Sequence, residues 1–274
     1  MRCRLNLSSG GRSLEGFGCS PIKRLRELGS LNIVTPLVLY KNNIIKHIRN
    51  FGCSPASMRN NLNINNSSGI PSKELNSIII GLILSDASLY RSSPTSNTRL
   101  EMSFGQDYKE FAFFIGELFS PYKTNPVKPV DIKVKDKVYT NYRLKTKSMP
   151  LFNYYFENFY KLDINTNKYT KTVPEAINEF GAYARDPVVL AFLIMADGNY
   201  DKGRKRVSIY INCYKKHEVE ELALAINKKL GIYAGVLHDR KDQWILTIGA
   251  KNLDLLRTTV SPYFHSSMLY RIGL

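Results

Sequence analysis

Two aspartates stand at the ends of two similar apolar segments, and this placement could support metal-dependent chemistry. Asp86 ends the apolar run in residues 78–88 (IIIGLILSDAS), and Asp197 ends the run in residues 190–198 (LAFLIMADG). Each run is too short to span a bilayer, and a helix that is apolar nearly all round must be buried. An acid at the C-terminus of a helix is disfavoured by about 0.3–1 kcal/mol. Two such acids predict a compensating cation.

Small residues favour close packing of these two predicted helices. They are Gly81, Ser85, Ala191 and Ala196. If the helices lie side by side, the two carboxylates come together, and like charges that close do not both stay ionised without a metal or another positive field. The alternative is a pair of unrelated core helices, each ending in a solvated aspartate. The matching segments around the two acids favour the paired arrangement.

The elements around the two acids follow the same order twice. In the first copy we predict helices and strands at residues 73–86, 100–105, 111–119, 130–134, 138–146 and 151–160. In the second copy we predict them at residues 187–197, 207–211, 218–230, 232–238, 244–248 and 253–263. Alternating apolar residues indicate half-buried strands. The predicted fold class is α+β, with pseudo-two-fold αββαββα lobes whose curved antiparallel sheets form a saddle.

The composition indicates a polyanionic partner. The chain of 274 residues carries 39 Lys and Arg against 23 Asp and Glu, a formal charge of +16. Such an excess favours nucleic acid first and an anionic membrane second, although a basic protein of the ribosomal type would look similar. The four cysteines and four histidines are scattered, which predicts neither a zinc site nor a disulfide framework. An apolar run long enough for a transmembrane helix is also missing.

The N-terminal 71 residues differ from the rest of the chain. They are rich in Asn, Ser, Gly and Arg and repeat the sequence FGCSP at residues 17–21 and 51–55. Residues 1–26 weakly resemble a transit peptide, and a reading frame fused to an upstream coding region would look the same. We predict a flexible, non-catalytic leader at residues 1–71, a first lobe at 72–173 and a second lobe, including its linker, at 174–274.

The two acidic segments resemble the LAGLIDADG homing endonucleases, in the single-chain form with two motifs that organellar introns encode. The first segment departs from the family pattern at Ser85 and Ala87, and the second departs at Phe192 and Met195. The final acid is kept in both. The resemblance implies a divalent metal, Mg²⁺, held by Asp86 and Asp197 together with the residues after them, Ala87 and Gly198.

A second signature of that family implies further catalytic residues. Its pieces are the strand end that carries Gln106, the aromatic run in residues 151–160, and the sequence KTVP that starts at Lys171. The resemblance makes Gln106 the residue that positions solvent and Lys171 a basic residue beside the acids. In the second half Asn212 matches Gln106 by its neighbours, whereas strand parity favours Cys213.

The C-terminal sequence SMLYRI, in residues 267–272, resembles the family's closing motif and puts Arg271 where that motif has lysine. Arginine stays charged and cannot shuttle a proton as lysine can, but it could still stabilise charge on a phosphate. The alternative for Lys171 and Arg271 is simple contact with the phosphate backbone.

Polar residues on the predicted strands are candidates for DNA contact, because two-stranded ribbons fit the major groove. In the first half they are Arg99, Glu101, Ser103, Lys133, Arg143 and Lys145. In the second half they are Arg204, Arg206, Ser208, Tyr210, Arg240, Lys241 and Gln243.

These observations predict a monomeric homing endonuclease that cuts double-stranded DNA with Mg²⁺. The alternative is a maturase that binds intron RNA and assists splicing, with or without cleavage. A third interpretation is a transcriptional or structural DNA-binding protein of the same fold. The Asn- and Lys-rich composition is typical of AT-rich organellar genomes, and we expect a mitochondrial location, with the chloroplast as the alternative.

Overall fold

The computed structural model describes residues 71–174, 177 and 187–274. The predicted leader, apart from residue 71, and most of the predicted linker lie outside these residues. We call residues 71–174 the first half and residues 187–274 the second half. The lobe boundaries at residues 72 and 174 stay predictions. Among the residues described, no helix is both long and apolar enough to cross a membrane.

Each half contains three α-helices and one four-stranded sheet among its described elements. The elements of the first half are α3 (Lys73–Leu84), β1 (Ser88–Tyr90), β2 (Arg99–Gly105), α4 (Lys109–Leu118), β3 (Lys128–Val134), β4 (Lys137–Lys145), α5 (Leu151–Phe159), β5 (Tyr160–Asp163) and β6 (Lys168–Lys171). The elements of the second half are α6 (Pro187–Asp197), β7 (Gly198–Asp201), β8 (Arg206–Ile209), α7 (Lys216–Leu230), β9 (Gly235–Arg240), β10 (Gln243–Ile248) and α8 (Ala250–Val260).

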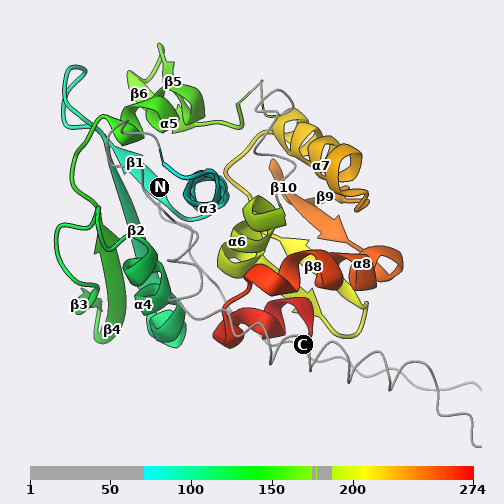
Figure 1. The fold of residues 1–274 in the computed structure, drawn as a ribbon. Helices are drawn as coiled ribbons and strands as arrows, with labels where there is room; N and C mark the ends of the chain where they lie inside the picture. The colour runs from blue at the N-terminus through cyan, green and yellow to red at the C-terminus, as the bar shows by residue number, and fades with distance from the viewer. Residues whose placement is uncertain (1–70, 175–176, 178–186) are drawn as a thin grey trace, which may run out of the picture. The chain divides into compact units, whose positions relative to one another are not determined.

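The two sheets have the same topology, which confirms the predicted α+β fold with a repeated pattern. Their strand orders are β1-β2-β4-β3 and β7-β8-β10-β9, with antiparallel neighbours throughout. The helices α3 and α6 lie side by side between the two sheets (Figure 1). Apolar side chains from both halves therefore form one continuous core around this helix pair.

Close approach of α3 and α6 depends on a glycine. A Cβ atom built on Gly81 would lie 2.6 Å from the carbonyl oxygen of Val189 and 2.9 Å from Cβ of Phe192. Phe192 itself replaces the glycine of the second motif, and its ring stacks on Phe114 of α4 with the centroids 6.3 Å apart. The absence of a side chain at Gly81 of α3 therefore leaves room for the backbone of α6 and for Phe192.

Hydrogen bonds define both ends of α3. The Ser72 hydroxyl caps its N-terminus by accepting from the Leu75 amide at 3.2 Å. At the other end the Ser85 hydroxyl donates to the carbonyls of Gly81 and Leu82, at 3.1 and 2.9 Å. The Ala87 amide donates to the Leu82 carbonyl at 3.0 Å. The chain therefore turns sharply just after the helix and carries residue 86 at its tip.

The β5–β6 hairpin was not expected from the sequence. Its strands pair Tyr160 with Lys171 and Asp163 with Lys168, and most of its residues are exposed or partly exposed. The burial alternation that reveals a half-buried strand is therefore missing. None of the described residues of the second half form a corresponding hairpin.

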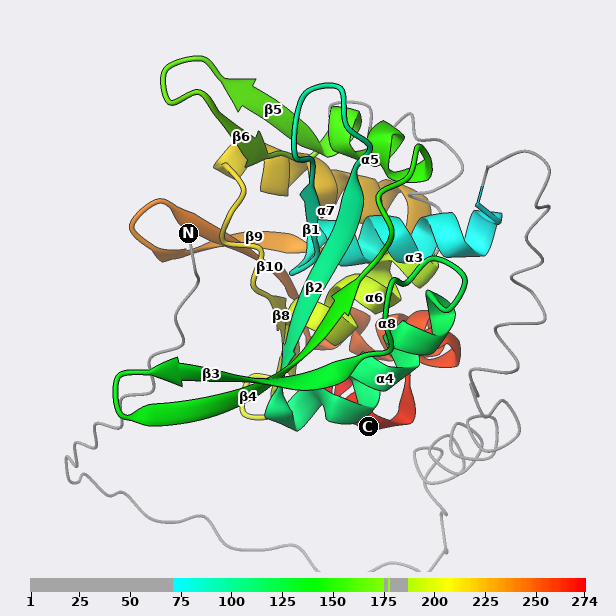
Figure 2. The ribbon, with the colours of Figure 1, turned by 90° about the vertical axis from the view of Figure 1, so that its left-hand side faces the viewer.

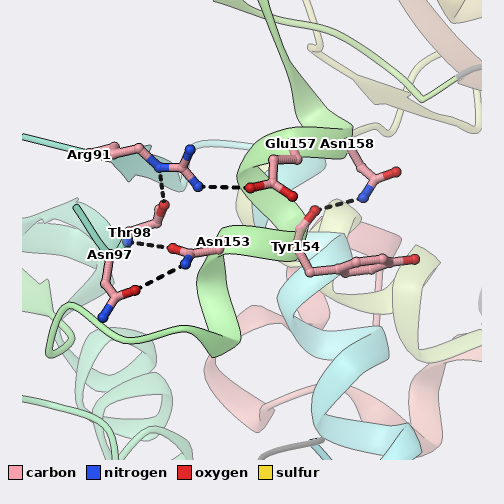
Figure 3. Close-up of polar contacts among 7 residues, drawn as sticks. All are labelled: Arg91, Asn97, Thr98, Asn153, Tyr154, Glu157 and Asn158. Atoms are coloured by element: carbon pink, nitrogen blue, oxygen red, sulfur yellow. Dashed lines mark hydrogen bonds and ion pairs between the residues drawn. The ribbon is translucent and has the colours of Figure 1, made fainter. Parts of the chain in front are cut away.

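A polar network ties the loop before β2 to α5, the helix that leads into this hairpin (Figure 3). The Thr98 amide donates to the Asn153 side chain at 2.8 Å, and the Arg91 guanidinium donates to the Thr98 hydroxyl at 3.0 Å. Arg91 also pairs with Glu157 of α5 at 3.2 Å. These contacts fix the base of the hairpin.

The β3–β4, β5–β6 and β9–β10 hairpins extend toward the same side of the molecule as the C-terminal end of α3 (Figure 2). The outer ends of β3 and β4 carry mostly exposed side chains. This side therefore presents exposed strands, with both polar and apolar side chains, around the tip of α3.

We predict that Gly81→Ala destabilises the protein by about 1–3 kcal/mol, because the added methyl group must push α3 and α6 apart. Urea unfolding measures this as a lower midpoint at an unchanged slope. The control is Gly249→Ala, where an added Cβ meets no atom within 4 Å. Equal midpoints for the two variants would contradict the close packing described here.

Candidate active site at the paired aspartates

The structure brings the two predicted acids together. Asp86 follows α3 at its C-terminal end, Asp197 is the last residue of α6, and their side chains lie within hydrogen-bonding reach of each other. Carboxylates this close repel each other unless one takes up a proton or a cation lies beside them. Asp86 is exposed on one side and Asp197 is partly exposed, so solvent reaches the pair.

Burial raises the pKa of both acids. The surrounding protein raises the pKa of Asp86 by desolvation although part of the side chain remains exposed. Desolvation and then the Asp86 charge hold the pKa of Asp197 well above its ordinary value. The cations Lys171 and Arg271 oppose both shifts. The pair is therefore a site of concentrated negative charge that a cation would stabilise.

Lys171 reaches this site from the end of β6. Its ammonium group donates to the carbonyl oxygen of Ser85 at 2.6 Å, directly beside Asp86. Burial lowers the pKa of Lys171, and the nearby side chains of Cys213, Asp197 and Asp86 act in the opposite direction. The structure therefore places Lys171 beside the acids.

Arg271 reaches the site from the C-terminal 3₁₀ helix Ser266–Ile272. Its side chain is buried, and its guanidinium donates to the carbonyl of Gly198, which follows Asp197. The guanidinium lies over the ring of Tyr108 at 5.1 Å and near the ring of Tyr270 at 5.7 Å. Its Nε has no hydrogen-bond partner among the residues described. This arginine therefore keeps donor capacity beside the acids.

Gln106 and Tyr108 lie on one short 3₁₀ helix, Gln106–Tyr108, that directly follows β2. The Gln106 side chain is exposed, whereas Tyr108 contacts Arg271 and hydrogen-bonds with Tyr270. Tyr108 was missed because a tyrosine after a strand carries no motif of its own. It joins the first half to the C-terminal arginine of the second.

The sheet register favours Cys213 over Asn212 as the counterpart of Gln106. Strand β1 pairs Ser88 with Glu101, and β7 pairs Asn199 with Ser208. Because Ser88 and Asn199 both stand two residues after the acids, Glu101 and Ser208 are equivalent. Counting five residues on from each reaches Gln106 and Cys213.

Counted in the same way past the end of β8, Asn212 corresponds to Gly105, so this count does not favour its predicted equivalence to Gln106. Its amide makes long hydrogen bonds of 3.4 Å to the side chains of Asp239 and Gln243. Cys213 is exposed and lies near Lys171 and Tyr160. Its place near Lys171 brings it close to the acid site.

The polar face of the first sheet agrees with most of the sequence predictions. Arg143 is opposite Ser103, and Lys145 is opposite Glu101, with an ion pair of 3.6 Å between the latter two. Glu101 also pairs with Arg99 at 2.5 Å. These residues share one face, while the alternate residues of β2 are buried.

The prediction that Lys133 shares this polar face is wrong. Lys133 pairs with Val138 and therefore lies on the opposite face from Arg143. The two-residue turn between β3 and β4 sets this parity. Lys128, which is opposite Arg143, shares the polar face and was missed.

The second sheet departs further from its predicted polar face. Ser208 lies on β8 beside Arg206 but is only 3% exposed, so it offers no open surface. Tyr210 is exposed, and Arg204 lies in the β7–β8 turn with an ion pair to Asp201 at 3.2 Å. The other candidates surround the tip of the β9–β10 hairpin and are Arg240, Lys241 and Gln243.

The donor set at the two acids fits a divalent cation of the magnesium type. Mg²⁺ prefers oxygen ligands and is commonly bound through one or two carboxylates while it keeps several waters. Asp86 and Asp197 supply the carboxylates. The Gly198 carbonyl already accepts from Arg271, but a carbonyl oxygen has a second lone pair. Among the residues described, His, Cys, Asp and Glu nowhere gather in threes.

We predict that Asp197→Asn stabilises the metal-free protein at pH 8. The pKa of Asp197 is higher in the folded than in the unfolded chain, so the free energy of unfolding of the wild type falls as pH rises between those values. The gain in the free energy of unfolding is therefore largest at high pH and shrinks toward pH 4, near the pKa of 3.8 that the group has in the unfolded chain. A gain of about 1 kcal/mol raises Tm by about 2–4 °C.

Thermal unfolding in chelator from pH 4 to pH 8 measures this difference. Asp254→Asn is the control, because the Asp254 side chain is 75% exposed. A variant at position 197 that is less stable than the wild type at pH 8 would contradict the raised pKa.

Comparison with known proteins identifies the family. The profile of the LAGLIDADG DNA endonuclease family matches residues 76–256. The chain is 24% identical over 226 residues to the cytochrome b mRNA maturase bI2 of Saccharomyces cerevisiae, covering 79% of this chain and 51% of that protein. It thus spans about half the length of that relative. It is also 26% identical over 207 residues to the protein of the same name from Debaryomyces hansenii, covering 73% of this chain and 74% of that protein.

Among solved structures, the homing endonuclease I-WcaI bound to its DNA recognition sequence matches with a TM-score of 0.62 and 21% identity, over 73% of this chain and 86% of that one. This likeness supports the fold. The family profile covers more than half of the chain, and the chain therefore belongs to the LAGLIDADG DNA endonuclease family.

Proposed function

We propose that this protein is a sequence-specific endonuclease that cuts double-stranded DNA in intron homing, by metal-dependent hydrolysis of phosphodiester bonds. The observation that carries the proposal is the pairing of Asp86 and Asp197, one acid from each half. The working form is a monomer, because one chain supplies both acids. We propose an organellar setting for it, the mitochondrion first and the chloroplast second.

Two acids from a repeated fold suit the symmetry of a duplex. The strands of DNA are related by local two-fold axes, and a protein with matching symmetry can address both. Asp86 and Asp197 stand at equivalent positions after α3 and at the end of α6. Each half can therefore direct one carboxyl group toward one scissile phosphate.

The residues around the acids have distinct proposed roles. Asp86 and Asp197 would hold a divalent cation with help from the Ala87 and Gly198 carbonyls. When bound, this cation supplies Lewis-acid polarisation of the phosphate and activation of water. The positive charges of Lys171 and Arg271, which act on both acids, would stabilise negative charge on the phosphate. For Gln106 we propose the orientation of solvent.

The strands beside the site suit the backbone of DNA. Arg143 and Lys145 of β4, with Lys128 of β3, offer exposed cations on one face of the first sheet. Arg240 and Lys241 do so at the β9–β10 tip. Such contacts release counterions and weaken as salt rises. The total charge of +16 favours the same partner.

We predict that Asp86→Asn and Asp197→Asn each lower the single-turnover cleavage rate by about 10²-fold or more, because each removes charge that holds a cation worth several kcal/mol. The substrate is duplex DNA that spans the intron insertion site of the host gene, with Mg²⁺. Affinity for that duplex, measured with Ca²⁺ in place of Mg²⁺, should stay within a few-fold of the wild type.

The control for these variants is Asp254→Asn on α8, which removes an exposed carboxylate. It should cut the duplex at the wild-type rate. A wild-type protein that binds the duplex but never cuts it would overturn the nuclease proposal.

The second candidate function is that of a maturase, which binds intron RNA and assists splicing. It is favoured by the two yeast relatives named as cytochrome b mRNA maturases. The family fold does not separate the two functions, because the family profile and the maturase relatives both match this chain. Retention of both acids favours cleavage, since RNA binding alone does not require them.

We predict that the wild-type protein binds its insertion-site duplex in preference to its own intron RNA by at least about tenfold, near 1.4 kcal/mol. Competition in a filter-binding assay at fixed salt measures this ratio. Tighter binding to the intron RNA, together with accelerated splicing and no DNA cleavage, would instead establish the maturase function.

A further inference from the structure

We propose that Glu218 of α7 is a positioning residue that holds Lys171 at the acid site. Glu218 belongs to the second half and Lys171 to the first. Where the proposal concerns cleavage, it rests on the proposed nuclease function. Its structural part can be tested without cleavage.

Glu218 is a buried carboxylate with two backbone partners. One oxygen accepts from the Val173 amide at 3.0 Å, and the other accepts from the Lys215 amide at 2.7 Å. The residue is only 6% exposed and Val173 only 2%. Hydrogen bonds to a charged acceptor are shorter and stronger than neutral ones. The carboxylate therefore joins the segment after β6 to the start of α7.

The position of Val173 makes this link relevant to the active site. Val173 stands two residues after Lys171, at the point where the chain leaves the β5–β6 hairpin. An isolated two-stranded hairpin is at best marginally stable in water. Lys171, whose ammonium reaches the Ser85 carbonyl, therefore depends on contacts outside the hairpin for its position.

Anchors from the first half hold β5, the strand of the hairpin that pairs with the lysine strand. Tyr160, opposite Lys171 in the hairpin, stacks on Phe156 with the ring centroids 5.0 Å apart. Its hydroxyl accepts from the Leu89 amide at 3.0 Å. Glu218 supplies a matching anchor from the second half, so that Lys171 is held between the two halves.

The same carboxylate also fixes the second half of the site. Lys215, its other partner, stands two residues after Cys213, which lies beside Lys171. One buried side chain thus sets the distance between the lysine strand of the first half and the Cys213 turn of the second.

Glu218→Gln tests this proposal with nearly unchanged shape. The glutamine keeps one acceptor oxygen but turns the other acceptor into an NH₂ group that faces a backbone N–H. The matched control is Glu220→Gln on the same helix, which changes charge equally but removes only an exposed ion pair with Lys216 at 3.4 Å. Both variants are made in the full chain.

The first measurement is acetylation of Lys171 by a small reagent, followed by mass spectrometry. Exposed Lys251 serves as the internal reference. We expect Glu218→Gln to label Lys171 several-fold faster and to speed amide exchange in the peptide that contains Val173. The control variant should match the wild type in both. Unchanged labelling of Lys171 in Glu218→Gln would overturn the proposal.

The second measurement is the single-turnover cleavage rate at saturating protein. We expect Glu218→Gln to cut about 10–10²-fold more slowly, with affinity for the duplex unchanged within a few-fold. Faster labelling of Lys171 with a normal cleavage rate would overturn a positioning role. A wild type that cuts no DNA would overturn the proposed function, and labelling alone would then decide the structural link.

Discussion

The contact between the two carboxyl groups at the ends of α3 and α6 governs the rest of this structure. Packing of the helices brings Asp86 and Asp197 within hydrogen-bonding reach of each other, an arrangement that is unfavourable for two ionised acids in a poorly solvated place. The protein maintains it with core packing around Gly81 and with two buried or partly buried cations. The free energy of the core therefore sustains a local electrostatic strain that a divalent cation would relieve.

The two halves place different cations beside their acids. Lys171 donates to the carbonyl just before Asp86, and Arg271 donates to the carbonyl just after Asp197. A titratable cation thus serves one acid and a permanently charged one the other. The sheet register adds the contrast between Gln106 and Cys213. The fold is repeated, but the chemistry at its centre is not.

Sequence reasoning found what depends on local pattern. The buried helices, the alternating strand β2 and the acids at the helix ends were all predicted from apolar periodicity. The errors occur where strand register or packing decides which side chains are exposed on a given face. A two-residue turn places Lys133 on the face opposite the predicted one, and packing buries Ser208. The β5–β6 hairpin escaped because its exposed strands carry no burial pattern. Long-range contacts such as Tyr108 with Arg271 leave no local signal at all.

The active site is assembled from contacts that cross between the halves. The Tyr214 hydroxyl, on the second half, donates to the Ile83 carbonyl of α3, and Glu218 accepts from Val173. Because the two acids come from different halves and Arg271 of the second half lies against Tyr108 of the first, neither half can form the site alone. The repeated topology therefore supplies the scaffold, and residues that differ between the two halves supply the contacts that make their interface a single site.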